Sequence, residues 1–211
     1  GGVRSSLERI TLEDVKAQYG KLIKPSGSTL VVVGSVDKSA LNAALEKYFG
    51  DWNGTPSGVE AEVATKTAPN GIHLVDFPGA SQSMVIVSRR TEGTGAKDFF
   101  PAQVFNRGFA GAFTARINMN LREDKGYTYG ARGGFMRSRK VGTYTIYSKV
   151  KRDTTRASID EIIKELAWVR GDKPLTAAEL GESKGGMVKS FPGQFERMGS
   201  VAGQLSGLVT K

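Results

Sequence analysis

Residues 114–135, TARINMNLREDKGYTYGARGGF, change from one secondary structure to another within a few positions. A helix is predicted over residues 116–123, and Gly126 stops it. An aromatic-rich strand is predicted over residues 128–136, directly after the break. A helix that runs at once into a strand indicates a mixed α and β fold, with the helix end beside the strand start.

Two side chains of this stretch have chemistry suited to a peptide carbonyl. Arg122 is predicted at the C-terminal end of the helix, where the helix dipole favours a cation. Tyr129 is predicted near the start of the strand. Together a guanidinium and a phenol offer two donors to a polarised carbonyl oxygen, as in an oxyanion hole. The alternatives are a surface arginine paired with Glu123 or Asp124, and a tyrosine packed in the sheet.

The flanking sequence predicts helices between antiparallel strands. Thr11–Asp14 reads as a capping box and Asp37 as the cap of a second helix, with a buried strand, TLVVVG, expected between them at residues 29–34. Further strands are expected at residues 72–77, 83–89 and 142–150, and helices at residues 99–113, 154–169, 174–187 and 195–209. This order predicts an α+β, two-layer sandwich with a mainly antiparallel sheet and helices packed on one face.

Residues 53–70, NGTPSGVEAEVATKTAPN, are polar, small and rich in Gly, Pro and Thr. Loops of that length are uncommon inside a compact domain. The segment is therefore expected to be a linker at a domain boundary.

The residue inventory limits the metal chemistry of the chain. The 211 residues include no cysteine and a single histidine, His73, which is expected in a strand with a structural or exposed role. A catalytic zinc site usually takes two or three imidazole ligands. The chain is therefore expected to bind no catalytic zinc by itself.

The net charge of +9 favours contact with anionic partners. The basic residues are spread along the chain, which is typical of a solvated basic surface. Residues 125–129, KGYTY, begin like an RNA-recognition motif, but Thr128, Gly130 and Arg132 replace the small residue, valine and aromatic that this motif requires. A nucleic-acid partner is therefore not expected.

Residues 121–129, LREDKGYTY, resemble the L-R-E-x-x-G-x-x-Y signature in the second half of pitrilysin/insulinase-family zinc peptidases, including bacterial processing-peptidase-like members. Residues 113–117, FTARI, resemble the lead-in to that signature, and residues 78–83, PGASQS, resemble the family's PGA-x-Q turn. Residues 11–14, with the strand and helix that follow, resemble the closing segment of the family's preceding half.

The resemblance implies a processing-peptidase-like metallohydrolase fold in which two homologous halves close around a peptide. One half binds zinc through His-x-x-Glu-His and activates water. The other contributes an arginine and a tyrosine to the substrate carbonyl, which match Arg122 and Tyr129 here. Tyr127 is a possible alternate, and its separation of two residues predicts that both phenols lie on the same strand face.

Where the zinc motif would lie, residues 98–112 read DFFPAQVFNRGFAGA, without histidine or glutamate. The chain is thus expected to be the non-catalytic half, inactive alone, with zinc in a partner half on the same chain or a separate subunit. Residues 1–52 would close a preceding half, and residues 71–211 would open the non-catalytic domain, truncated at its C-terminus. An inert scaffold or assembly subunit is the alternative function.

The compartment is only weakly indicated by the sequence. The family resemblance to secreted bacterial members predicts a periplasmic or secreted protein, with a cytoplasmic one as the alternative. No apolar stretch approaches the ~18–20 residues that cross a membrane, so no membrane insertion is expected.

Overall fold

A computed structural model describes residues 2–58, 70–138 and 140–210. The chain divides into two compact units, each considered by itself. Unit 1 comprises residues 1–73 and 198–209, and unit 2 comprises residues 74–197 with the last two residues. Most of the linker expected at residues 53–70 falls on residues 59–69, which lie outside the described residues.

The regular elements in the described part of unit 1 are helices, joined by irregular segments. Its helices are α1 (Arg4–Leu7), α2 (Leu12–Leu22), α3 (Lys38–Phe49) and α8 (Met198–Thr210). The predicted caps are confirmed, because Thr11 accepts a hydrogen bond from the Asp14 N–H at 3.2 Å and Asp37 accepts one from the Ala40 N–H at 2.7 Å. Both caps satisfy backbone donors that a helix start leaves free.

The prediction of strands at residues 29–34 and 72–77 is wrong. Both segments are irregular, and Leu30, Ile72 and Leu74 are 64%, 90% and 90% exposed. A strand needs a neighbour for its backbone N–H and C=O groups, and the described residues supply none to either segment. His73 consequently lies in an exposed irregular segment rather than in a strand.

Unit 2 contains an antiparallel sheet in the order β1-β3-β2. Its strands are β1 (Gln82–Glu92), β2 (Thr128–Arg137) and β3 (Val141–Lys151). Its helical elements are α4 (Phe99–Asn106), η1 (Arg107–Gly111), α5 (Arg116–Asn118), η2 (Met119–Asp124), η3 (Arg152–Thr154), α6 (Thr155–Trp168), α7 (Ala177–Ser190) and η4 (Pro192–Phe195).

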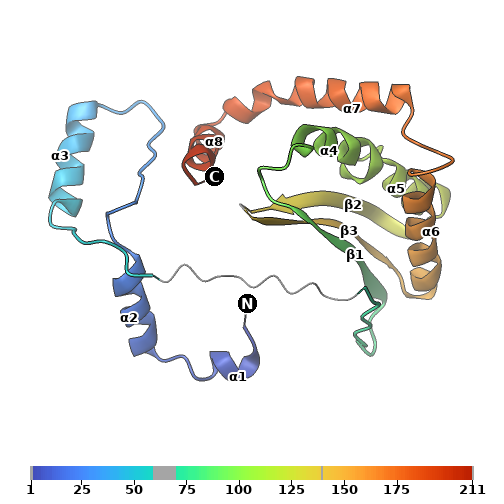
Figure 1. Ribbon diagram of the computed structural model, residues 1–211, viewed down its shortest axis with the longest axis horizontal. Helices are drawn as coiled ribbons and strands as arrows, with labels where there is room; N and C mark the ends of the chain where they lie inside the picture. The colour runs from blue at the N-terminus through green and yellow to red at the C-terminus, as the bar shows by residue number, and fades with distance from the viewer. Residues whose placement is uncertain (1, 59–69, 139, 211) are drawn as a thin grey trace. The chain divides into compact units, whose positions relative to one another are not determined.

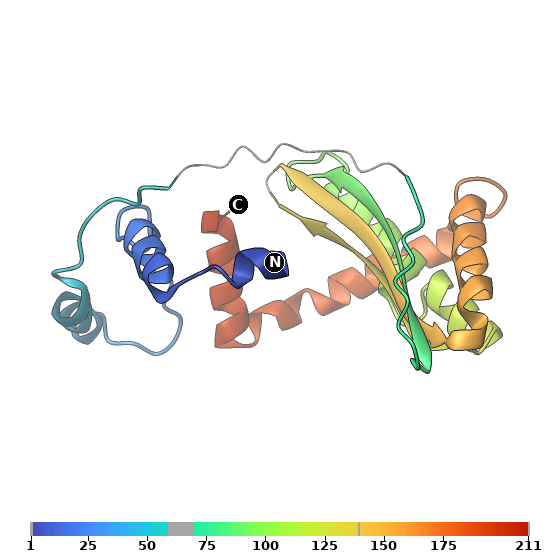
Figure 2. The same cartoon turned by 90° about the horizontal axis from the view of Figure 1, so that it is seen from below.

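The helices of unit 2 lie along one face of its sheet, as Figures 1 and 2 show. Elements α4, α5 and α6 adjoin the strands, whereas α7 packs on α4 and η1. The core between these layers is aliphatic and aromatic, and includes Val85, Phe109, Leu121, Ile146 and Ile162. The predicted α+β, two-layer architecture with helices on one face is confirmed.

The two units differ in how they are packed. All the buried residues in the described part of the chain belong to unit 2. In unit 1 the apolar side chains of α2 stay open, with Val15 at 54% and Tyr19 at 65% exposed. In a search of the described residues, no helix proved long and apolar enough to span a membrane.

Candidate functional site

Arg122 lies in the last turn of η2, as expected for a helix-end cation. Gly126 ends the element with a φ of +63°, a conformation that glycine adopts without strain. Its N–H donates to the Arg122 carbonyl at 3.1 Å, and the Tyr127 N–H donates to the Leu121 carbonyl at 2.9 Å. These bonds satisfy the free carbonyls of the helix end and direct the chain into β2.

The Arg122 guanidinium has two contacts. Its Nε lies 3.2 Å from a carboxylate oxygen of Glu123, and its Cζ lies 4.4 Å from the centre of the Phe113 ring. The side chain is 35% exposed. The predicted alternative of an arginine paired with Glu123 thus describes one of its contacts, and the remaining donors of the guanidinium can still reach a ligand.

Tyr129 lies in a β-bulge at the start of β2. Thr128 pairs with Val150 and Ala131 pairs with Ser148, so Tyr129 and Gly130 together oppose the single residue between those partners. A bulge adds one residue to a strand and changes the direction of the side chain it carries. The Tyr129 side chain is 91% exposed and is not packed in the sheet.

Buried polar side chains hold this bulge. Asn118 accepts a hydrogen bond from the Ala131 N–H at 2.9 Å, and Ser148 donates to the Gly130 carbonyl at 3.0 Å. Thr128 accepts from the Gly130 N–H at 3.0 Å and donates to the Lys149 carbonyl at 2.6 Å. The backbone on both sides of Tyr129 is therefore fixed while its phenol stays open.

Tyr127 and Tyr129 do not share a face, so that prediction is wrong. Tyr127 precedes β2 and packs against the core cluster, whereas Tyr129 is exposed. Alternation by two applies within a regular strand, and here one residue precedes the strand while the other lies in the bulge. Of the two phenols, Tyr129 is the more exposed, and Tyr127 is partly buried.

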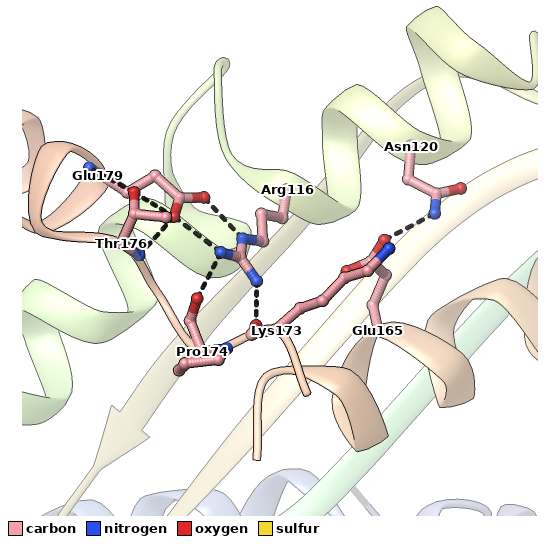
Figure 3. A network of polar contacts seen from close by, with 7 residues as sticks. All are labelled: Arg116, Asn120, Glu165, Lys173, Pro174, Thr176 and Glu179. Carbon is pink, nitrogen blue, oxygen red and sulfur yellow. Dashed lines mark hydrogen bonds and ion pairs between the residues drawn. The ribbon is translucent and has the colours of Figure 1, made fainter. Parts of the chain in front are cut away.

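A second polar network ties the helices behind the site together (Figure 3). Arg116 forms two bonds to Glu179, with Nε at 2.6 Å and Nη2 at 2.7 Å from its carboxylate oxygens. It also donates to the carbonyls of Lys173 and Pro174. The hydrogen bond from Arg116 lowers the pKa of Glu179 to about 2.

Arg116 belongs to the FTARI motif at residues 113–117, and the sequence alone indicates no role for it. The structure gives it one, because it joins α5 to the start of α7. The sequence signal that could have indicated this role is the capping box at Thr176–Glu179. The box is present in the structure, where Glu179 Oε2 accepts a hydrogen bond from the Thr176 N–H at 2.7 Å. A carboxylate fixed at a helix start is a ready partner for an arginine.

Zinc ligands do not gather among the described residues. No group of three or more His, Cys, Asp or Glu side chains could hold a metal ion in that part of the chain. Residues 98–112, where the zinc motif would lie, form α4, η1 and their ends. This segment contains the amide side chains of Gln103 and Asn106 but no histidine or glutamate. The side chains do not fit a zinc site, and no zinc-dependent step is assigned to them.

Comparisons with known proteins identify the family and the fold. The profile of the Peptidase M16 inactive domain matches residues 9–187. The chain belongs to the peptidase M16 inactive-domain family. A probable inactive metalloprotease, YmfF, from Bacillus subtilis (strain 168) is 30% identical over 130 residues, which cover 61% of this chain and 30% of the relative.

Two solved structures share the fold. The peptidase M16 inactive domain from Pseudomonas fluorescens has a TM-score of 0.81 at 21% identity and covers 99% of this chain. A protease from Helicobacter pylori has a TM-score of 0.80 at 18% identity, also over 99% of the chain. The chain spans 49% and 51% of those two structures, about half of each.

Proposed function

We propose that this M16 inactive domain helps to enclose a peptide and stabilises its scissile carbonyl oxygen through Arg122 and Tyr129. A homologous half, in the same polypeptide or in another subunit, would bind zinc and activate the attacking water. The observation that carries the proposal is the bulge at Tyr129, whose backbone is bonded on both sides while its phenol is 91% exposed. Preorganised donors of this kind stabilise developing charge without the cost of reordering.

The division of the chain between two halves is also a proposal. Residues 1–52 would close the preceding half, residues 53–70 would link the halves, and residues 71–211 would open the non-catalytic domain. The lack of buried side chains in the described part of unit 1 supports this division, because its helices leave apolar faces uncovered. The length of the related structures supports it too, since each is about twice as long. The periplasmic or secreted location stays a prediction.

The carbonyl role is tested in the assembled peptidase, with the zinc-binding half present. Arg122→Ala is expected to lower turnover of a fluorogenic peptide about 100- to 1,000-fold, the usual effect of losing one such donor. Tyr129→Phe, which removes only the phenolic O–H, is expected to lower it in the same direction. Zinc content of the partner half should stay unchanged in both variants.

Tyr127→Phe is the matched control, since Tyr127 packs against the core and its loss of a hydroxyl should leave turnover close to that of the parent. Unchanged turnover in both Arg122→Ala and Tyr129→Phe would reject the carbonyl role. That result would favour the scaffold or assembly function.

A further inference from the structure

The Phe113 ring faces two guanidinium groups. Phe113 lies between η1 and α5 and is 50% exposed. The Cζ of Arg122 lies 4.4 Å from the ring centre and the Cζ of Arg132 lies 5.9 Å from it. The separation of the two Cζ atoms is therefore at most the sum of these two distances. Both cations are within the range in which an aromatic face attracts them.

The positive charge of this cluster is only partly balanced. Glu123 pairs with Arg122, but no ion pair joins Arg132 to any residue that the structure describes. The Nη1 atom of Arg132 is buried without a hydrogen-bond partner in the same part of the chain. Buried donors are normally satisfied, and two nearby cations repel each other. An added carboxylate at the accessible part of the cluster would balance the unpaired charge of Arg132.

Arg132 belongs to the strand that also carries Tyr129. It lies on β2 three residues after Tyr129, opposite Tyr147 of β3, which is 49% exposed. Its neighbours Ala131 and Gly133 point toward the helices, since Ala131 is fully buried and a side chain at Gly133 would meet Ala110. Alternation along the strand therefore directs Arg132 to the face that the helices of unit 2 leave open.

We infer that Arg122, Arg132 and the Phe113 ring form a site for a carboxylate, occupied by a Glu or Asp side chain of the bound peptide. Planar guanidinium groups bind carboxylates with paired hydrogen bonds. The Phe113 ring contacts both guanidinium groups, and Arg132 sets a preference for acidic peptides. The peptide assignment rests on the proposed function, whereas carboxylate binding by the cluster does not.

The test measures peptide binding to the whole chain, without the zinc-binding half. Two fluorescent octapeptides, blocked at both ends, carry either one central glutamate or glutamine in its place. The parent chain is expected to bind the glutamate peptide about tenfold more tightly at low salt, with the preference falling as salt rises. Arg132→Gln is expected to reduce the preference to about twofold or less.

Matched variants separate the cluster from general basicity. Arg90→Gln removes an exposed arginine from β1, on the same open sheet face, and should keep the preference. Glu123→Gln removes the competing carboxylate and should strengthen it. The readout is binding without turnover, so a failure of the carbonyl role does not affect this result. Arg132→Lys replaces Arg132→Gln as the test if the latter does not fold. It keeps the charge without the planar guanidinium and should lower the preference severalfold.

Equal binding of the two peptides by the parent chain would overturn the inference, as would a full preference in a folded Arg132→Gln variant. A third probe, the glutamine peptide with a free C-terminal carboxylate, distinguishes binding of a side-chain carboxylate from binding of a peptide C-terminus. Tight binding of that probe, with weak binding of the blocked glutamate peptide, would overturn the side-chain assignment.

Discussion

Asn118, the last residue of α5, joins the helical segment to β2, because its Oδ1 accepts a hydrogen bond from the Ala131 N–H at 2.9 Å. Its Nδ2 donates to the Phe113 carbonyl at 2.6 Å, and the residue is 1% exposed. One side chain therefore fixes both the bulge that carries Tyr129 and the backbone at Phe113, whose ring contacts Arg122.

Asn118→Ala is expected to destabilise the chain by about 2 kcal/mol, because it leaves the buried Ala131 N–H without a partner and removes the bond to the Phe113 carbonyl. Urea unfolding measures the loss. Native-state hydrogen exchange at the Ala131 amide should also become faster, since that N–H loses its acceptor. Asn53→Ala is the control, as the side chain of this exposed residue donates to the Asp51 carbonyl two positions earlier in the chain. An unprotected Ala131 amide in the parent chain would contradict the assigned bond.

The Arg116–Glu179 pair predicts a dependence of stability on pH. The pKa of Glu179 is lowered to about 2 by the hydrogen bond from Arg116, whereas the unfolded chain has a value of about 4.3. The contribution is therefore present above the unfolded value and is lost as pH falls from about 5 toward 2. With Glu179 30% exposed, about 2 kcal/mol is expected after allowing for screening.

Urea midpoints between pH 2 and pH 7 measure this contribution, and Glu179→Gln should flatten the acid limb of the curve. Glu182→Gln changes an exposed acid on the same helix and should leave the curve as it is. A parent-like acid limb in Glu179→Gln would show that other carboxylates carry the effect.

Neighbouring glycines in β2 make a matched pair. A Cβ at Gly133 would lie 2.6 Å from the Ala110 Cβ and 3.1 Å from the Tyr144 hydroxyl, whereas one at Gly134 would meet nothing within 4 Å. Gly133→Ala is expected to destabilise the chain by about 1–3 kcal/mol through overpacking. Gly134→Ala should be neutral or slightly stabilising, because alanine restricts the unfolded chain. Equal midpoints in thermal unfolding would contradict the close approach of η1 to β2.

The sequence was most informative where local signals and tertiary packing agree. The caps at Thr11 and Asp37, the helix end at Gly126 and the β2–β3 pair were all predictable, because each depends on neighbours close in the chain. Helical spacing also predicted α6, whose Ile162 is fully buried.

Three features could not be predicted from local pattern. The segment at residues 29–34 has strand-forming residues, but strand formation needs a partner, which no local pattern supplies. The bulge at Tyr129 follows from the Asn118 and Ser148 bonds, which are distant in sequence. The shared contact of Arg122 and Arg132 with the Phe113 ring arises only from the tertiary fold. Tyr129 was predicted from its spacing from Arg122 in the family signature, and its exposure was not foreseeable.

The uneven packing of the two units predicts opposite effects of mutation. Ile162→Ala in α6 should cost about 2–5 kcal/mol, because the side chain is fully buried in unit 2. Tyr19→Ser in α2 should change the stability of this chain by no more than about 0.5 kcal/mol, because the ring is 65% exposed. If residues 1–52 close a preceding half, Tyr19→Ser should still weaken association with that half, as measured by co-purification. A large loss of stability in the isolated chain would instead indicate that α2 is already packed against a core.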